Sequence, residues 1–192
     1  MTSPLPISPV IAEPMSAISP DVSAWSEIVL EHLAGASQEG ASAVSFIRNR
    51  NVKIGFRQQN GTGAMWFIDG NIYLNSNTYS LATPPTDAYM LNLIAHEAQH
   101  LKQRLITALS VYGELEAWQL GFRVYQALGG VISSSALNEL MGIPLSFDRD
   151  MLQKVRFLMQ DYAGKGYRID LLPRYPLWKE IGYDLTRKVP NS

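Results

Sequence analysis

The sequence contains no cysteine, which excludes disulfide bonds and metal sites built from thiolates. Its formal net charge is only -1, with 16 Lys and Arg against 17 Asp and Glu, so no overall field draws the protein to nucleic acid or acidic lipid. No run of about 20 apolar residues is present, and we therefore expect no membrane span. The lack of cysteine fits a reducing compartment, although a secreted protein can also lack it.

Lys and Arg are also missing from the first twenty residues, which five prolines interrupt. A secretory signal needs a basic start and an unbroken apolar segment, so we expect no signal peptide and favour a cytoplasmic location. This Pro- and Ser-rich stretch has no hydrophobic period and predicts a disordered arm over residues 1–20. The rest of the chain, residues 21–192, suits one domain, because 46% of the sequence is hydrophobic.

Apolar residues recur at helical spacing through most of this domain. The predicted helices cover approximately residues 21–35, 37–48, 87–104, 110–128, 135–141 and 148–162. Residues 51–75 instead alternate between apolar and polar and predict a small antiparallel sheet, with strands at 52–56, 64–68 and 71–74. Asp69-Gly70 between the last two strands is a signal for a two-residue hairpin, in which both central residues need positive φ. The fold class is therefore α+β and mostly helical.

The helix predicted at 87–104 carries the sequence His96-Glu97-Ala98-Gln99-His100. The two histidines are four residues apart, so on a helix they lie about 40° from each other and one turn apart. Two imidazoles placed in this way can bind one zinc ion, and Glu97 can reach a water on the metal; this is the H-E-x-x-H pattern of zinc hydrolases. The alternative is a buried helix that carries two satisfied histidines by chance.

A catalytic zinc site also needs a third protein ligand, and the next helix offers Glu114 and Glu116. If the turn between the helices is centred near residues 106–107, Glu114 lies level with His100 across an antiparallel pair. The two glutamates are about 200° apart on a helix, so only one of them can face the metal. The spacing favours Glu114 and leaves Glu116 as the alternative.

With these residues the chain resembles the gluzincins, the zincin group whose third ligand is a glutamate on a later helix. Many small prokaryotic members show H-E-x-x-H followed by E-x-x-A-D or E-x-E-A-[DN], with the ligand three residues before the Ala. In this sequence that position is Glu114, ahead of Ala117. The order of small sheet, active-site helix and glutamate helix matches as well, over approximately residues 40–130. The resemblance implies a minimal zincin-like domain with its sheet near the active-site helix, and the helices predicted after residue 130 form a helical C-terminal extension of it.

The same resemblance implies a Zn²⁺-dependent peptidase that acts on a peptide or protein substrate. His96, His100 and Glu114 would hold the metal, and Glu97 would be the general base. Gluzincins commonly add a Tyr, His or Arg that stabilises the oxyanion, for which this chain offers Tyr79, Tyr112, Tyr167 and Arg168. An edge strand of zincins binds the peptide backbone, and here strand 71–74 or its neighbour 64–68 would do so. His32 lies in an ordinary amphipathic helix and is expected to take no part.

The sequence departs from the family pattern at Trp118, where the family often has an Asp or Asn that orients a histidine ligand. An indole N–H can only donate a hydrogen bond, so the acceptor for the histidine must come from elsewhere. Asn92 or a backbone carbonyl are candidates. Trp118 also favours a second interpretation, a zincin-like binding or regulatory module with weak or no turnover. A third is a helical interaction protein in which the motif arose by chance.

Overall fold

The computed structural model describes residues 20–176, apart from residues 61, 68, 104, 165, 166 and 168. The predicted N-terminal arm, except for its last residue, and Arg168 lie outside the described residues. The fold is α+β and mostly helical, as predicted. The helices are α1 (Pro20–Ala36), α2 (Gln38–Asn49), α3 (Ala88–Lys102), α4 (Leu105–Ala108), α5 (Val111–Ala127), α6 (Ser135–Met141) and α7 (Arg149–Ala163), followed by a 3-10 turn, η2 (Ile169–Leu171).

The helix starts are set by side chains that accept hydrogen bonds from the free N–H groups of the first turn. Asp87 accepts from the Met90 N–H at the start of α3, which settles the choice between Thr86 and Asp87. Ser110 accepts from the Gly113 N–H at the start of α5, whereas Thr107, the other candidate cap, lies inside α4. These two caps fix where the helices with the H-E-x-x-H motif and the glutamate pair begin.

The sheet contains β1 (Ile54–Arg57), β2 (Ala64–Trp66) and β3 (Ile72–Asn75) in the order β1-β3-β2. β2 pairs with β3 antiparallel, but β1 pairs with β3 parallel, so the prediction of a purely antiparallel sheet is wrong. The alternation of apolar residues identifies strands without saying which of them pair. The chain reverses its direction between β1 and β2 and again between β2 and β3. β3 therefore runs in the direction of β1, next to which it lies.

The β2–β3 hairpin is also wider than the expected two-residue turn. Gly70 has a φ of 78°. The Phe67 N–H donates to the Asn71 carbonyl at 3.0 Å and the Gly70 N–H to the Phe67 carbonyl at 2.8 Å, which encloses a three-residue loop with glycine in the left-handed position. The Asp69 carboxylate holds this loop, because it accepts from the Asn71 N–H at 2.9 Å.

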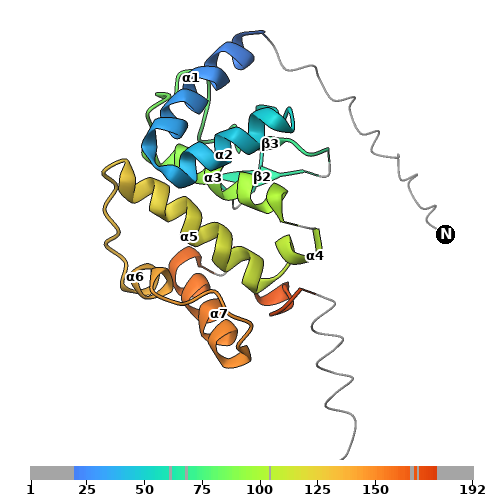
Figure 1. Cartoon of the computed structure of the whole chain (residues 1–192), viewed down its shortest axis with the longest axis vertical. Coiled ribbons are helices and arrows are strands. Elements are labelled where there is room, and N and C mark those ends of the chain that lie inside the picture. Colours follow the sequence, from blue (N-terminus) through green and yellow to red (C-terminus); the bar gives the residue numbers. More distant parts are fainter. Residues whose placement is uncertain are drawn as a thin grey trace, which may run out of the picture.

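Helix α5 lies between α1, α2 and α3 on one side and α6 and α7 on the other (Figure 1), and a hydrophobic cluster lies on each of these sides. The first joins α1, α2, the sheet and α3, and includes Val124 of α5. The second joins the other side of α5 to α6 and α7 and includes Leu115 and Leu152. Helix α3 is buried, as its apolar residues predicted, with Leu91 and Ile94 fully inaccessible. None of the helices in the described part of the chain is long and apolar enough to cross a membrane.

Helices α3 and α5 form an antiparallel pair whose backbones approach closely at Gly121. A Cβ atom added there would lie 2.4 Å from the Asn92 side-chain oxygen, 2.9 Å from the Asn92 carbonyl oxygen and 3.3 Å from the His96 Cβ. Real side chains do not tolerate such distances, so only glycine permits this packing. Gly121 therefore sets the distance at which α5 presents its residues to the histidines of α3.

Candidate metal centre

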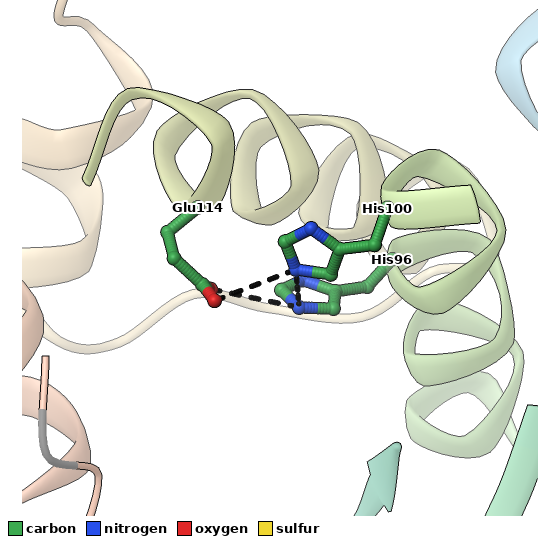
Figure 2. A group of neighbouring side chains, drawn as sticks. All are labelled: His96, His100 and Glu114. Carbon is green, nitrogen blue, oxygen red and sulfur yellow. Dashed lines mark hydrogen bonds and ion pairs between the residues drawn. The ribbon is translucent and has the colours of Figure 1, made fainter. Parts of the chain in front are cut away.

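Three side chains from α3 and α5 converge on one point (Figure 2). The Nε2 atoms of His96 and His100 are 3.0 Å apart. Glu114 places one carboxylate oxygen 3.8 Å from His96 Nε2 and the other 3.5 Å from His100 Nε2. The structure thus brings together the two histidines and the glutamate that the sequence favoured as a ligand set, although they belong to different helices.

The separations of these ligand atoms fit a tetrahedral metal ion. Zinc–ligand bonds of about 2.0–2.1 Å at tetrahedral angles place neighbouring ligand atoms about 3.3 Å apart. The two Nε2 atoms are 3.0 Å apart, the two oxygens of Glu114 lie 3.8 Å from His96 Nε2 and 3.5 Å from His100 Nε2, and one ligand atom from each residue lies within 4.8 Å of the others. Two imidazole nitrogens and one carboxylate oxygen are also a common donor set for a catalytic zinc ion, which leaves the fourth position open.

A glutamine at the end of α3 orients the His100 ring. Gln103 uses its side-chain NH₂ group to donate to the Gly113 carbonyl at 3.0 Å and to Glu116 Oε2 at 2.8 Å. Its side-chain oxygen lies 3.1 Å from His100 Nδ1 and accepts from that nitrogen. In the neutral ring the Nδ1 atom then carries the proton, and Nε2 directs its lone pair at the cluster. Gln103 is thus the acceptor that Trp118 could not be, and sequence reasoning missed it.

The position of Gln103 also distinguishes the two glutamates of α5. Glu114 faces the histidines, whereas Glu116 accepts from Gln103 and lies one step further from the cluster. Glu116 therefore fixes the side chain of Gln103, which in turn orients the His100 ring. A glutamine three residues after the last motif histidine was the available signal, since on a helix residues i and i+3 are neighbours.

His96 is held in its neutral form. Burial and, to a smaller extent, the nearby His100 lower its pKa to about 3, against the opposite effects of Glu114 and of a backbone hydrogen bond to Ala117. Because His96 Nε2 faces the cluster, the backbone of Ala117 takes the other ring nitrogen, as expected for a backbone acceptor. Asn92, the other candidate, has its side-chain oxygen against Gly121. A neutral imidazole is the form that binds a metal ion.

His100 and Glu114 form a buried pair of opposite charge. Burial by itself would lower the pKa of His100, but the hydrogen bond and the charge of Glu114 outweigh it and raise this pKa to about 9. Burial would raise the pKa of Glu114, but its hydrogen bond to His100 and the charges of both histidines hold it below its ordinary value. The Glu114 carboxylate is therefore ionised and requires a positive partner at this point, which His100 or a metal ion can supply.

Glu97 lies against both the cluster and the sheet. One of its carboxylate oxygens is 4.0 Å from His96 Nε2, and the other accepts from the Trp66 N–H of β2 at 2.9 Å. Burial, together with the charge of Glu114, raises the pKa of Glu97 to about 7, although His100 and the Trp66 N–H act in the opposite direction. A carboxylate with a pKa near neutrality is suited to accept and return a proton at physiological pH.

Trp118 supports the centre through a tyrosine from the C-terminal segment. Its indole N–H donates to the Tyr167 hydroxyl at 2.7 Å, and that hydroxyl donates to Glu114 Oε2. Burial and the charge of Glu114 raise the pKa of Tyr167 well above its ordinary value, so its phenol keeps the proton that it donates. Trp118 therefore acts only as a donor, as the sequence required, but its partner lies 49 residues further along the chain.

Of the three tyrosines that could stabilise an oxyanion, Tyr167 is the one whose hydroxyl contacts the cluster, at Glu114. Tyr79 is buried in the first hydrophobic cluster, where burial raises its pKa to about 12. Tyr112 stacks on Phe147, with ring centroids 4.3 Å apart. His32 is exposed on α1 and does not belong to the cluster of His96, His100 and Glu114.

A cavity of about 470 Å³ opens beside the cluster, between β2 and helices α3, α5 and α7. β2 is an outer strand of the sheet and β3 is the central one, so the suggestion that strand 71–74 forms the edge is wrong. Hydrogen bonds join Gly63 to Asn75 and Phe67 to Asn71, so the backbone groups of Ala64 and Trp66 point away from β3. The Trp66 N–H already reaches Glu97 in that direction, which shows that this free edge faces the cluster.

The arrangement can hold a divalent cation beside a carboxylate that exchanges protons, at the floor of a cavity with a free strand edge. Each of these components comes from the described residues of α3, α5 and β2. Comparisons of the chain with protein-family models, with curated proteins and with solved structures found no match.

Proposed function

We propose that the protein is a zinc-dependent metallopeptidase in which His96, His100 and Glu114 hold the metal and Glu97 is the general base. The observation that carries the proposal is the convergence of two Nε2 atoms and one carboxylate within 4.8 Å of one another, with Glu97 beside them. The resemblance of the motif to the gluzincins supports the same assignment. Imidazole and carboxylate donors at these separations favour zinc over calcium or magnesium, which prefer oxygen ligands.

When bound, a zinc ion lowers the pKa of a water molecule toward about 7 and polarises a carbonyl group. Glu97 accepts the proton from the attacking water, whose oxygen forms the new bond to the carbonyl carbon. The carbon–nitrogen bond breaks, and Glu97 returns the proton to the leaving amine. The Trp66 N–H keeps the Glu97 carboxylate in place during both transfers, because it binds Oε2 and leaves Oε1, the oxygen closer to His96, free of that bond.

The free edge of β2 is the proposed binding site for the substrate backbone. An extended peptide can pair with the outward N–H and C=O of Ala64 and the outward C=O of Trp66, which are main-chain contacts that tolerate many sequences. The substrate class is accordingly a peptide or an unfolded protein segment. A cytoplasmic location is part of the proposal and is supported by the lack of cysteine.

The second candidate function is a zincin-like binding module without turnover. Trp118 favours it, because the indole occupies the position from which family members orient a histidine, and its partner Tyr167 contacts Glu114. In this candidate the cluster still holds a metal ion. Metal content therefore separates both candidates from a chance motif, and turnover separates them from each other.

The test measures zinc and proteolysis on the same preparations. We expect one zinc ion per chain in the wild-type protein and none in His96→Ala. We expect Glu97→Gln to retain zinc and to lose cleavage of a quenched-fluorescence peptide mixture, because the amide cannot accept a proton. Zinc with no cleavage by the wild type would support the binding module, and a wild type without zinc would leave only the chance motif. An unchanged rate in Glu97→Gln would remove Glu97 from the mechanism.

A further inference from the structure

The cavity extends past the histidines into a recess with largely aromatic walls. Its walls come from three helices that the sequence places far apart: Tyr89 and Leu93 from α3, Trp118 and Phe122 from α5, and Tyr162 from α7. These five residues are called the aromatic recess here.

The recess continues the two helical stripes that carry the metal ligands. Leu93 and Tyr89 lie three and seven residues before His96 on α3, and Trp118 and Phe122 lie four and eight residues after Glu114 on α5. Residues three or four apart share one face of a helix, and each turn advances about 5.4 Å. The recess therefore begins about one turn from the ligands and ends about two turns away. The recess is therefore within side-chain reach of a peptide bond held at the metal centre.

Contacts among the rings fix the shape of the recess. The centroid of the Trp118 ring lies 5.9 Å from that of Phe122 and 5.5 Å from that of Tyr162, and Phe122 and Tyr162 are 5.9 Å apart. Trp118 is further held by Tyr167, which accepts its indole N–H. Trp118 and Phe122 are 5% exposed, whereas Tyr89 and Tyr162 are 42% and 36% exposed and form the entrance. The walls are thus preformed and lose little freedom when they bind a ligand.

The charges around the recess select against an ionised side chain. Among the described residues that line the cavity there is no Lys or Arg, and its two carboxylates are those of Glu97 and Glu114. Glu97 is engaged by the Trp66 N–H, and Glu114 by His100 and Tyr167. An acidic or basic side chain would lose its hydration without gaining a free partner, whereas a bulky neutral one gains by burial.

We propose that the aromatic recess is the subsite for a bulky neutral side chain, aromatic or long aliphatic, on the residue that flanks the cleaved bond. The proposal names a substrate class and rests on the proposed peptidase function. The occupant is part of the substrate, because the recess is continuous with the metal centre and with the free edge of β2.

The first test uses the zinc-loaded full chain and a set of alanine-rich quenched-fluorescence peptides. Each carries Phe, Leu, Ala, Asp or Lys at one position, which is moved through the peptide so that either neighbour of the cleaved bond is sampled. We expect kcat/KM to be about 10- to 100-fold higher for Phe or Leu than for Ala at one of these neighbours, and lowest for Asp and Lys. Equal rates, or a preference for a charged residue at both neighbours, would overturn the proposal.

Variants at the entrance assign the preference to the recess. Tyr89→Ala and Tyr162→Ala should each reduce the Phe-to-Ala ratio of kcat/KM by at least about threefold, because each removes one wall. Tyr89→Phe is the matched control and should keep the ratio, since it keeps the ring. If both alanine variants keep the wild-type Phe-to-Ala ratio of kcat/KM, residues outside the aromatic recess determine the selectivity, and the assignment is contradicted.

A binding measurement separates this proposal from the peptidase function. Fluorescein-labelled peptides with one Phe or with Ala in its place are titrated into zinc-loaded Glu97→Gln. If the wild type cleaves nothing but the Phe peptide binds at least about tenfold more tightly, the subsite holds and the peptidase function fails. If the wild type cleaves without preference and the two peptides bind equally, the peptidase function holds and the subsite is refuted.

Discussion

Gln103 and Glu116 join the two ligand-bearing helices through a side-chain hydrogen bond of 2.8 Å. Because the same glutamine accepts from His100 Nδ1, the position of the His100 ring on α3 depends on a carboxylate on α5 that does not itself face the histidines. The pair supplies the support for His100 that Trp118, directly after Ala117, does not supply. It has a measurable consequence for metal affinity.

We expect alanine substitutions at Glu114, Gln103 and Glu116 to weaken zinc binding to different extents. Glu114→Ala should weaken zinc most because it removes a ligand. Gln103→Ala should weaken it by about 10- to 100-fold because it leaves the His100 ring unsupported. Glu116→Ala should have the smallest effect, since Gln103 keeps its bond to the Gly113 carbonyl. Competition with a chromogenic chelator measures all three, and a larger loss in Glu116→Ala than in Glu114→Ala would make Glu116 the ligand.

Tyr167→Phe should destabilise the protein by about 1–3 kcal/mol, because the buried Trp118 N–H loses its acceptor and Glu114 loses a donor. Urea unfolding of the zinc-free protein measures the free energy. Trp118→Phe and the double variant complete a thermodynamic cycle, in which we expect the double variant to cost less than the sum of the single ones. Strict additivity would mean that the two side chains do not act as a unit.

The close approach of α3 and α5 predicts opposite effects for two Gly→Ala substitutions in helices. Gly121→Ala should lower the free energy of unfolding by at least about 1–3 kcal/mol, because the new methyl group meets Asn92 at 2.4 Å. Gly35→Ala in α1 is the control: nothing lies within 4 Å, so it should raise stability by about 0.5–1 kcal/mol. Thermal unfolding compares them, and equal effects would contradict the packing described at Gly121.

The zinc-free protein should become less stable as the pH rises from about 8 to 9.5. Burial lowers the pKa of His100, but Glu114 outweighs it and raises this pKa to about 9, above the ordinary value of 6.5. The stability from this proton is fully present below about pH 6.5 and is lost as the pH passes through about 9. Between about pH 8 and 9.5 the free energy of unfolding should fall by about 1 kcal/mol. His96 and Glu97, with pKa values of about 3 and 7, have largely titrated below pH 8.

Denaturant unfolding of chelator-treated protein across this pH range measures the loss. Zinc-loaded protein should not show it, because the metal binds the neutral ring at every pH in the range. His32→Gln, at an exposed histidine, is the control and should retain the loss, whereas His100→Gln should abolish it. A fall that persists in His100→Gln would assign the pH dependence to another group.

The sequence predicted those parts of the structure that depend on neighbours along the chain. The helical period and the capping residues Asp87 and Ser110 located α3 and α5, and the spacing from His100 to Glu114 placed them level. The order of the strands and the partners of Gln103 and Trp118 were not predictable in this way. They depend on which elements meet in space, and a period of two or 3.6 residues carries no information on that.

Tyr167 has a consequence for the order of events during synthesis. The two histidines and the glutamate leave the ribosome within a span of 19 residues, but the hydroxyl that binds Glu114 follows 53 residues after it. Helices α6 and α7, which pack on α5, lie in between. A nascent chain thus carries His96, His100 and Glu114 long before the second cluster has closed around α5, so the finished centre forms only after Tyr167 has been synthesised.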